Sequence, residues 1–351
     1  MASSEVSSEK SDIDAVVEQC HAENIPLFFT VKSVADLTVQ DKHGVDFFFD
    51  KRCWSCTDFV DVSRFVALRY ELAASPCCYS VSFFDESKNL VSGKTTESIL
   101  DFSLLVGHST VPKGATFAKF INFLGSPEYY DTPKNPFVQG FLTEEDYVQY
   151  KKRFLKHDGL KIVCLGDSLT EGHQGFYKQS LSYPYYLAKF LGCETVNHGR
   201  SSFTASDYYY LFSRTNINVS DADFVLIMLG SNGGLTFSGD KELLGYKSLI
   251  SEVKKKVKPE CKVILLTPTH ATVNPERYTY GWFRSIENAV SEVRKLADGK
   301  DFHLIDVFAE SPIQSENEDI YQPVDGVHMC AAGYEALARF LAPRIEAFIS
   351  H

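Results

Sequence analysis

The chain has 351 residues, of which 44% are hydrophobic and 13% aromatic, and its formal net charge is −11 at pH 7. This apolar content is typical of a folded protein, and the length exceeds that of one ordinary domain. Because no basic block offsets the acidic charge, we expect neither nucleic acid nor a membrane surface as a partner. The sequence has no run of eighteen apolar residues, so it predicts no transmembrane helix.

The first dozen residues, Met-Ala-Ser-Ser-Glu-Val-Ser-Ser-Glu-Lys-Ser-Asp, are polar and lack the apolar core of a signal peptide. We expect residues 1–24 to be a disordered tail and the protein to be cytoplasmic, or secreted if a leader was removed. The cysteines number nine, and Cys164 and Cys261 lie in apolar strand patterns, where reduced thiols are common. Cys53 and Cys56 have Cys-X-X-Cys spacing but no second such pair, so we predict no metal and no cofactor.

Residues 25–136 contain short β-type runs separated by turn residues, without a long helical pattern. Such a pattern is typical of an antiparallel β sandwich, so we predict an all-β domain here. The runs that carry this prediction are 27–31, 45–49, 65–70, 79–84 and 116–123.

Residues 137–158 are expected to connect this domain to the rest of the chain. Thr143 is followed by Glu-Glu-Asp, the pattern of a capped helix start. The short helix that begins there would carry Tyr147, Tyr150 and Phe154 towards one of the domains.

Strands and helices alternate over residues 159–351, which predicts a parallel sheet with right-handed crossovers. The predicted fold class is therefore a three-layer α/β/α sandwich preceded by the β sandwich. The expected strands are 161–165, 194–197, 224–229, 262–266 and 303–305. The expected helices include 183–191, 241–257, 278–297 and 331–349.

The apolar strand at residues 162–165 runs straight into Gly166-Asp-Ser168. Reactive groups gather at the carboxyl ends of strands in open α/β sheets, and a glycine permits a sharp turn there. A serine nucleophile needs a base, and Asp325 and His328 are spaced to supply a carboxylate and an imidazole from one turn. The order Ser, Asp, His completes a catalytic triad. By itself, however, a strand followed by Gly-Asp-Ser is also an ordinary turn.

Two further apolar strands end in residues that an esterase could use. One is followed by His-Gly199 and the other by Gly-Ser-Asn232. Acyl transfer places negative charge on the former carbonyl oxygen, which needs preorganised donors. The candidates are the backbone N–H groups of Ser168 and Gly199 and the side-chain amide of Asn232. Alternatively, Asn232 is a turn residue and Gly199 simply ends a strand.

Together Ser168, Gly199, Asn232 and His328 resemble, block by block, the SGNH/GDSL hydrolases, a family of esterases, lipases and carbohydrate O-acetyl esterases. The resemblance covers the whole region of alternating strands and helices. It implies a Ser-His-Asp acyl-enzyme mechanism with the oxyanion donors named above. One position departs from the family pattern, because Gly233 stands where the third block usually has an aspartate. A carboxylate that could support the loop after Asn232 is therefore missing.

The N-terminal region resembles, less specifically, the jelly-roll modules often joined to carbohydrate esterases. This pairing favours a serine esterase that removes acetyl or another short acyl group from a carbohydrate. Three segments that leave strand ends, 171–176, 200–203 and 267–270, could line its pocket or be plain loops. With the residue before Ser168, the candidate pocket residues are Asp167, His173, Arg200 and His270.

Two other functions stay open. The same machinery would serve a lipase or thioesterase acting on fatty acyl esters, although no apolar lid for a long acyl chain is evident. The chain could instead be a carbohydrate-binding protein whose hydrolase half is a silent scaffold. The expected partner is an acylated carbohydrate or another small ester, and the sequence determines neither the sugar nor the oligomeric state.

Overall fold

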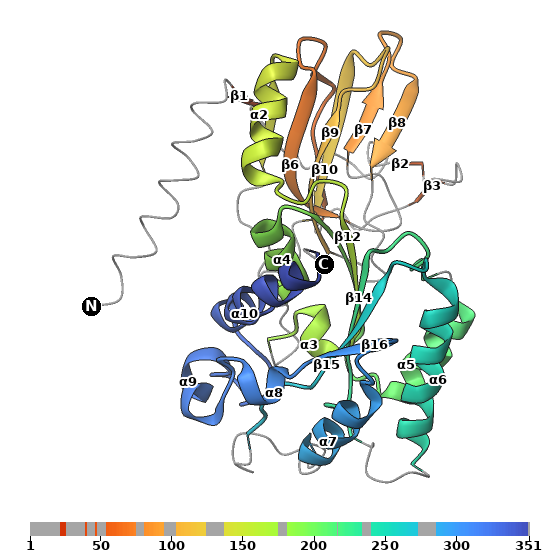
Figure 1. Ribbon diagram of the computed structural model, residues 1–351. Helices are drawn as coiled ribbons and strands as arrows, with labels where there is room; N and C mark the ends of the chain where they lie inside the picture. Colours follow the sequence, from red (N-terminus) through yellow and green to blue (C-terminus); the bar gives the residue numbers. More distant parts are fainter. Residues whose placement is uncertain are drawn as a thin grey trace. The chain divides into compact units, whose positions relative to one another are not determined.

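The computed structural model describes part of the chain (Figure 1). The described residues fall into two compact units, one up to Asp158 and the other from Gly159 onward. No helix among them is long and apolar enough to cross a membrane. The described ranges are 22–25, 39–40, 46–47, 54–74, 81–94, 103–123, 137–174, 181–215, 217–233, 240–272 and 286–349.

The first unit is built from antiparallel strands. They are β1 (Ala22–Asn24), β2 (Val39–Gln40), β3 (Asp46–Phe47), β4 (Trp54–Cys56), β5 (Val60–Asp61), β6 (Ala67–Ala74), β7 (Val81–Phe84), β8 (Leu90–Lys94), β9 (Ser103–Thr110), β10 (Phe117–Phe123) and β11 (Phe137–Phe141). One sheet has the order β1-β11-β6-β9, and another has the order β4-β10-β7-β8 with β5 also on β10. Strands β2 and β3 form a separate pair.

The two larger sheets of this unit share one buried core. Leu68 and Leu72 of β6 pack in the same cluster as Phe83 of β7 and Phe120 of β10. An antiparallel β domain is therefore present, as the sequence predicts. Its assignment to the jelly-roll modules stays a prediction, and the strand expected at 27–31 lies outside the described residues.

The segment predicted as a connector divides into a strand and a helix. Strand β11 is an inner strand of the first sheet, between β1 and β6. Helix α2 (Glu144–Phe154) follows, and the Thr143 hydroxyl caps it by accepting the Asp146 N–H at 3.1 Å. Tyr147 and Tyr150 of α2 pack against Phe141. This helix is thus anchored on the β unit.

The second unit is a three-layer α/β/α sandwich around a parallel sheet, which confirms the predicted fold class. Its strands are β12 (Lys161–Gly166), β13 (Glu194–Gly199), β14 (Phe224–Met228), β15 (Lys262–Leu266) and β16 (Phe302–Ile305). They lie in the order β13-β12-β14-β15-β16. The chain therefore reverses direction across the sheet between β12 and β14, and ligands of such sheets bind at this switch point.

Helices cover both faces of the parallel sheet (Figure 1). On one face lie α5 (Ala205–Arg214), α6 (Lys241–Lys256) and α7 (Ile286–Leu296), and on the other α4 (Tyr183–Leu191) and α10 (Ala331–Ile349). Alternate side chains of each strand serve the two cores, as Val163 and Ile162 of β12 do. The shorter helices are α3 (Ser168–Glu171), α8 (Val307–Glu310), η3 (Ser315–Asn317) and α9 (Glu318–Tyr321).

Helix α5 lies outside the helices expected from the sequence, although the sequence holds a signal for it. Thr204 and Asp207 form a capping box, in which each side chain accepts the other residue's backbone N–H. Tyr208 and Phe212 bury one face of the helix. Of the helix expected at 278–297, the structure describes the part from Ile286 onward.

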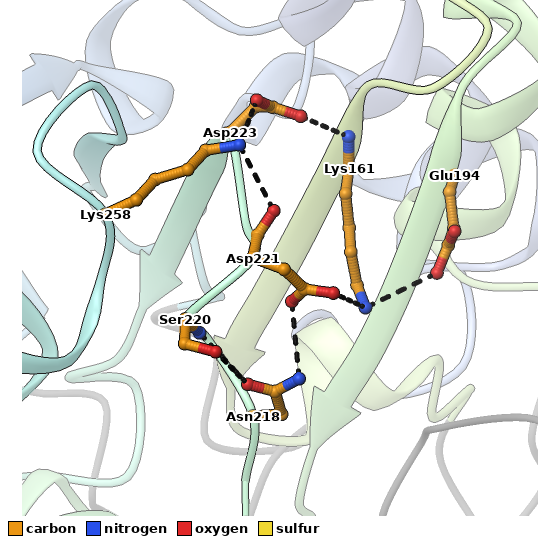
Figure 2. A network of polar contacts seen from close by, with 7 residues as sticks. All are labelled: Lys161, Glu194, Asn218, Ser220, Asp221, Asp223 and Lys258. Carbon is orange, nitrogen blue, oxygen red and sulfur yellow. Dashed lines mark hydrogen bonds and ion pairs between the residues drawn. The ribbon is translucent and has the colours of Figure 1, made fainter.

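At the amino ends of the strands a buried lysine ties three segments together (Figure 2). The Lys161 side chain is 8% exposed, and its Nζ lies 3.0 Å from Asp221 Oδ2 and 3.6 Å from Glu194 Oε1. The Lys161 backbone N–H donates to Asp223 Oδ2 at 2.8 Å, and Asp223 Oδ1 accepts from Lys258 Nζ at 2.6 Å. The starts of β12 and β13 are thereby held to the segment that enters β14.

Replacing Asp223 by alanine removes the acceptor of the Lys161 N–H and the partner of Lys258. We expect Asp223→Ala to lower the free energy of unfolding by about 1–3 kcal/mol, because a buried backbone donor loses its acceptor. Asp301→Ala, which breaks only a more exposed ion pair with Lys254, should cost less than about 1 kcal/mol. Urea denaturation measures both losses, and equal losses would contradict the special role of Asp223.

Candidate active site

Ser168, His328 and Asp325 form a continuous hydrogen-bonded chain. The Ser168 Oγ lies 2.9 Å from His328 Nε2, and His328 Nδ1 lies 2.7 Å from Asp325 Oδ2. An ionised carboxylate can only accept, so Nδ1 carries a proton and Nε2 is left to accept the serine hydroxyl hydrogen. Ser168 is 6% exposed, and the side chains of His328 and Asp325 are 13% and 12% exposed. The arrangement is thus nearly buried and oriented for proton transfer.

The turn that carries Asp325 also holds its carboxylate. Asp325 Oδ1 accepts the backbone N–H of Val327 at 3.0 Å and of His328 at 2.8 Å. Burial acts to raise the pKa of Asp325, but the hydrogen bond and charge of His328, together with these two N–H groups, outweigh it and lower the pKa. The carboxylate is therefore ionised near neutral pH and sets the tautomer of His328.

A close approach between neighbouring segments shapes the turn before Ser168. A Cβ atom at Gly166 would lie 2.6 Å from the Met228 carbonyl oxygen, so glycine is needed there. Ser168 is the first residue of α3, and Asp167 caps that helix by accepting the Leu169 N–H at 3.0 Å. The nucleophile candidate is thus placed by a strand end and a helix start that are both fixed.

Asp167, a predicted pocket residue, has no exposed surface. Burial raises its pKa to about 6, although the Leu169 N–H and the nearby Ser231 hydroxyl act in the opposite direction. Within the described part of the chain, neither Asp167 Oδ2 nor Ser231 Oγ has a hydrogen-bond partner. Because its side chain is fully buried, Asp167 contributes to the site by capping α3.

The three predicted oxyanion donors lie at the ends of β12, β13 and β14, but their hydrogen bonds differ. Asn232 Nδ2 donates to the Phe203 carbonyl at 2.9 Å, and within the described part of the chain its second N–H has no acceptor. The Ser168 N–H lies at the start of α3, where no intrahelical acceptor exists. In contrast, the Gly199 N–H already donates to Asn197 Oδ1 at 2.8 Å.

Asn197 is a site residue that sequence reasoning missed. Besides holding the Gly199 N–H, its Nδ2 donates to the Thr170 carbonyl at 2.8 Å and to Ser182 Oγ at 3.0 Å. Gly199 itself packs so closely on α3 that a Cβ atom would lie 2.1 Å from the Glu171 backbone nitrogen. The end of β13 and helix α3 are thus joined. A lone asparagine in a strand carries no sequence signal for this role.

His173, another predicted pocket residue, lies beside the triad. Its ring centroid is 4.6 Å from that of His328. Burial and the neighbouring His328 lower the pKa of His173 to about 4, although Asp325 acts in the opposite direction. His173 is therefore a neutral imidazole at pH 7, placed next to the proposed general base.

The last two predicted pocket residues adjoin the site through their backbones. The Arg200 N–H donates to the Gly166 carbonyl at 2.8 Å. The His270 carbonyl accepts from Gln322 Nε2, which also donates to the Val327 carbonyl at 2.7 Å. His270 is thus linked to the turn of the triad by one side chain. Among the described residues, no group of three or more His, Cys, Asp or Glu side chains could hold a metal ion.

A family comparison covers this site. Residues 164–336 match the model of the GDSL-like lipase/acylhydrolase family. This part of the chain is a GDSL-like lipase/acylhydrolase domain. The match confirms the resemblance of this part of the chain to that family and supports a hydrolase that acts on esters.

Several solved structures are similar to about half of the chain. The lipase/acylhydrolase from Enterococcus faecalis is 20% identical over 54% of this chain and 96% of its own, with a TM-score of 0.43. A carbohydrate acetylesterase family member from Sinorhizobium meliloti is 20% identical over 55% and 100%, with a TM-score of 0.42. Axe2, an acetylxylan esterase from Geobacillus stearothermophilus, is 24% identical over 54% and 94%, with a TM-score of 0.41. A search of curated proteins found no match.

His198, which precedes Gly199, is a buried histidine with 2% exposure. Burial, with a smaller contribution from Lys161, lowers its pKa to about 4 from the ordinary 6.5. At His198 the unfolded chain therefore binds more protons than the folded protein between these two pH values. The contribution of this residue to stability falls as the pH is lowered from 6.5 to 4, whereas the raised pKa of Asp167 acts in the opposite direction.

We expect His198→Phe to flatten this pH dependence, because the substitution removes the proton taken up at this position on unfolding. His173 has a similarly lowered pKa, so part of the fall should remain. Thermal unfolding of the wild type and the variant between pH 7 and pH 4 measures the effect. If the melting temperatures of the wild type and the variant fell equally between pH 7 and pH 4, His198 would take up no extra proton on unfolding.

Proposed function

We propose that this protein is a serine esterase that removes acetyl or another short acyl group from a carbohydrate. The hydrogen-bonded chain from Ser168 through His328 to Asp325 carries this proposal. A serine hydroxyl becomes an effective nucleophile only beside a base, and the 2.9 Å separation of Oγ and Nε2 supplies one. The acylhydrolase family of the domain makes an ester the expected substrate.

In the first step, His328 Nε2 takes the Ser168 hydroxyl proton while Oγ attacks the ester carbonyl carbon. Ionised Asp325 stabilises the imidazolium. The carbonyl oxygen becomes an oxyanion, to which the Ser168 N–H and the Asn232 amide donate, each lowering the barrier by about 3 kcal/mol. The Gly199 N–H would donate to the oxyanion only in a bifurcated hydrogen bond that it shares with Asn197 Oδ1.

The tetrahedral intermediate then collapses. His328 gives its proton to the leaving alcohol oxygen as the C–O bond breaks, and Ser168 is left as an acyl ester. Water enters, His328 removes one of its protons, and the water oxygen attacks the acyl carbon. Ser168 departs as the leaving group and regains its proton from His328, which releases the carboxylic acid.

Two features support a short acyl group and a carbohydrate alcohol. The triad has a polar neighbour, since the neutral His173 ring lies beside His328. Polar side chains of this kind suit hydroxyl-rich substrates better than long hydrocarbon chains. The chain also joins the hydrolase domain to an antiparallel β sandwich, and the choice of a carbohydrate rests on this pairing.

On p-nitrophenyl esters we expect kcat/KM to be highest for acetate, lower for butyrate and lowest for octanoate. Ser168→Ala should lower kcat by at least about 10³-fold, because only substrate binding and the oxyanion donors remain. Ser213→Ala, at an exposed serine of α5, is the control and should keep wild-type activity. Activity retained by Ser168→Ala would rule out the mechanism.

Acetate release from acetylated oligosaccharides and polysaccharides tests the alcohol side of the substrate. We expect release that depends on Ser168, because a sugar hydroxyl is the proposed leaving group. Enzymatic measurement of free acetate, with Ser168→Ala as the blank, gives the result. If no acetylated glycan is a substrate while aryl acetates are, the carbohydrate assignment is wrong and the mechanism stands.

A lipase acting on longer acyl esters is a second candidate, and one observation favours it. Ile320 and Val324 are 60% and 38% exposed in the segment that leads into Asp325. Exposed apolar side chains this close in sequence to Asp325 are candidates for contact with an acyl chain. In that case octanoate would be the best ester, and Ile320→Ser would lower kcat/KM for octanoate but not for acetate. Acetate-selective turnover rejects this candidate.

A further inference from the structure

We propose that Glu171 is a positioning residue of the oxyanion hole. Its carboxylate clamps the loop of residues 200–203, and that loop in turn holds the side-chain amide of Asn232. This inference rests on the proposed esterase function and deepens it. The contacts that support it run in three steps from helix α3 to the amide.

The first step joins α3 to the loop. Glu171 ends the short helix that begins at Ser168, and it is 9% exposed. Its Oε2 accepts the Ser201 backbone N–H at 2.5 Å and also the Ser201 hydroxyl. Two hydrogen bonds on one oxygen fix both the backbone and the side chain of Ser201. The loop is thereby tied to the helix of the nucleophile.

The second step lies within the loop. Ser202 has a φ of 65°, in the left-handed region that residues other than glycine rarely adopt. The Phe203 N–H donates to the Arg200 carbonyl at 3.3 Å, which closes the turn. Such a backbone conformation persists only where the surroundings impose it. The bonds from Glu171 to the adjacent Ser201 supply that constraint.

The third step reaches the amide. Phe203 ends the loop, and its carbonyl accepts from Asn232 Nδ2 at 2.9 Å. This bond orients the amide plane and leaves the second N–H for the oxyanion. Gly233, the next residue, has no side chain with which to hold Asn232. Among the described residues, the Phe203 carbonyl is the hydrogen-bond partner of the amide, so the orientation of the amide depends there on the loop that Glu171 clamps.

A double-mutant cycle on p-nitrophenyl acetate hydrolysis tests the clamp. Asn232→Ala should lower kcat by about 10²- to 10³-fold. Glu171→Ala should lower kcat by about 10-fold with little change in KM, because the affected donor acts mainly in the transition state. In the Asn232→Ala background, the same Glu171→Ala change should cost less than about 2-fold, since the amide that it positions is gone.

Two further variants separate positioning from general damage. Glu171→Gln should recover most of kcat, because the amide oxygen can accept both bonds from Ser201. Glu242→Ala is the matched control, since Glu242 accepts the N–H of Ser206 at 2.8 Å and its hydroxyl at 2.7 Å, joining α5 to α6. It should leave kcat within about 2-fold of the wild type. If Glu171→Ala does not fold, Ser201→Ala removes one of the two donors and enters the same cycle.

Several outcomes overturn the clamp. An unchanged kcat in Glu171→Ala does so, as does an equal loss in the wild-type and Asn232→Ala backgrounds. If Asn232→Ala itself leaves kcat unchanged, the oxyanion role of the amide fails and the clamp fails with it. Activity retained by Ser168→Ala instead refutes the esterase mechanism, which keeps failure of the proposed function distinct from failure of the clamp alone.

Discussion

The close approach of β12, β13 and α3 is the constraint on which the rest of the site depends. At Gly166 and Gly199 a Cβ atom would collide with backbone atoms of the neighbouring segments. Without side chains there, the strand ends and the short helix can pack tightly enough to hold Ser168 at the switch point of the sheet. The hydrogen bonds of Asn197 then lock β13 to α3. The proposed nucleophile is therefore positioned by backbone contacts, which leave it little freedom to shift.

The two ends of the parallel sheet use buried charge differently. At the amino ends Lys161 is paired with two carboxylates, so its charge is compensated and the segments are held in register. At the carboxyl ends Asp325 is hydrogen-bonded to His328, and His328 is hydrogen-bonded to the Ser168 hydroxyl. Asp167 shows what burial does without full compensation, because one of its oxygens has no partner among the described residues and its pKa rises to about 6.

Preorganisation explains why the proposed oxyanion donors are not equivalent. The Asn232 amide is held by one of its two N–H groups and keeps the other for the reaction, whereas the single N–H of Gly199 is occupied by Asn197. An oriented donor costs no reorganisation when charge develops in the transition state. On this view the loop that carries Phe203 belongs to the reaction machinery, although none of its side chains needs to contact the ester.

Local patterns in the sequence determined the strands of the parallel sheet, the bounds of helices α4 and α10, and the order of Ser168, Asp325 and His328. Apolar alternation, glycines and caps act over a few residues, so neighbours along the chain are enough to read them. Tertiary structure alone decided that β11 is an inner strand, that Asn197 donates to the Thr170 carbonyl, and that Glu171 bonds Ser201. These contacts depend on which segments the packed core brings together, and a residue's own surroundings in the sequence carry no signal for partners that lie tens of positions away.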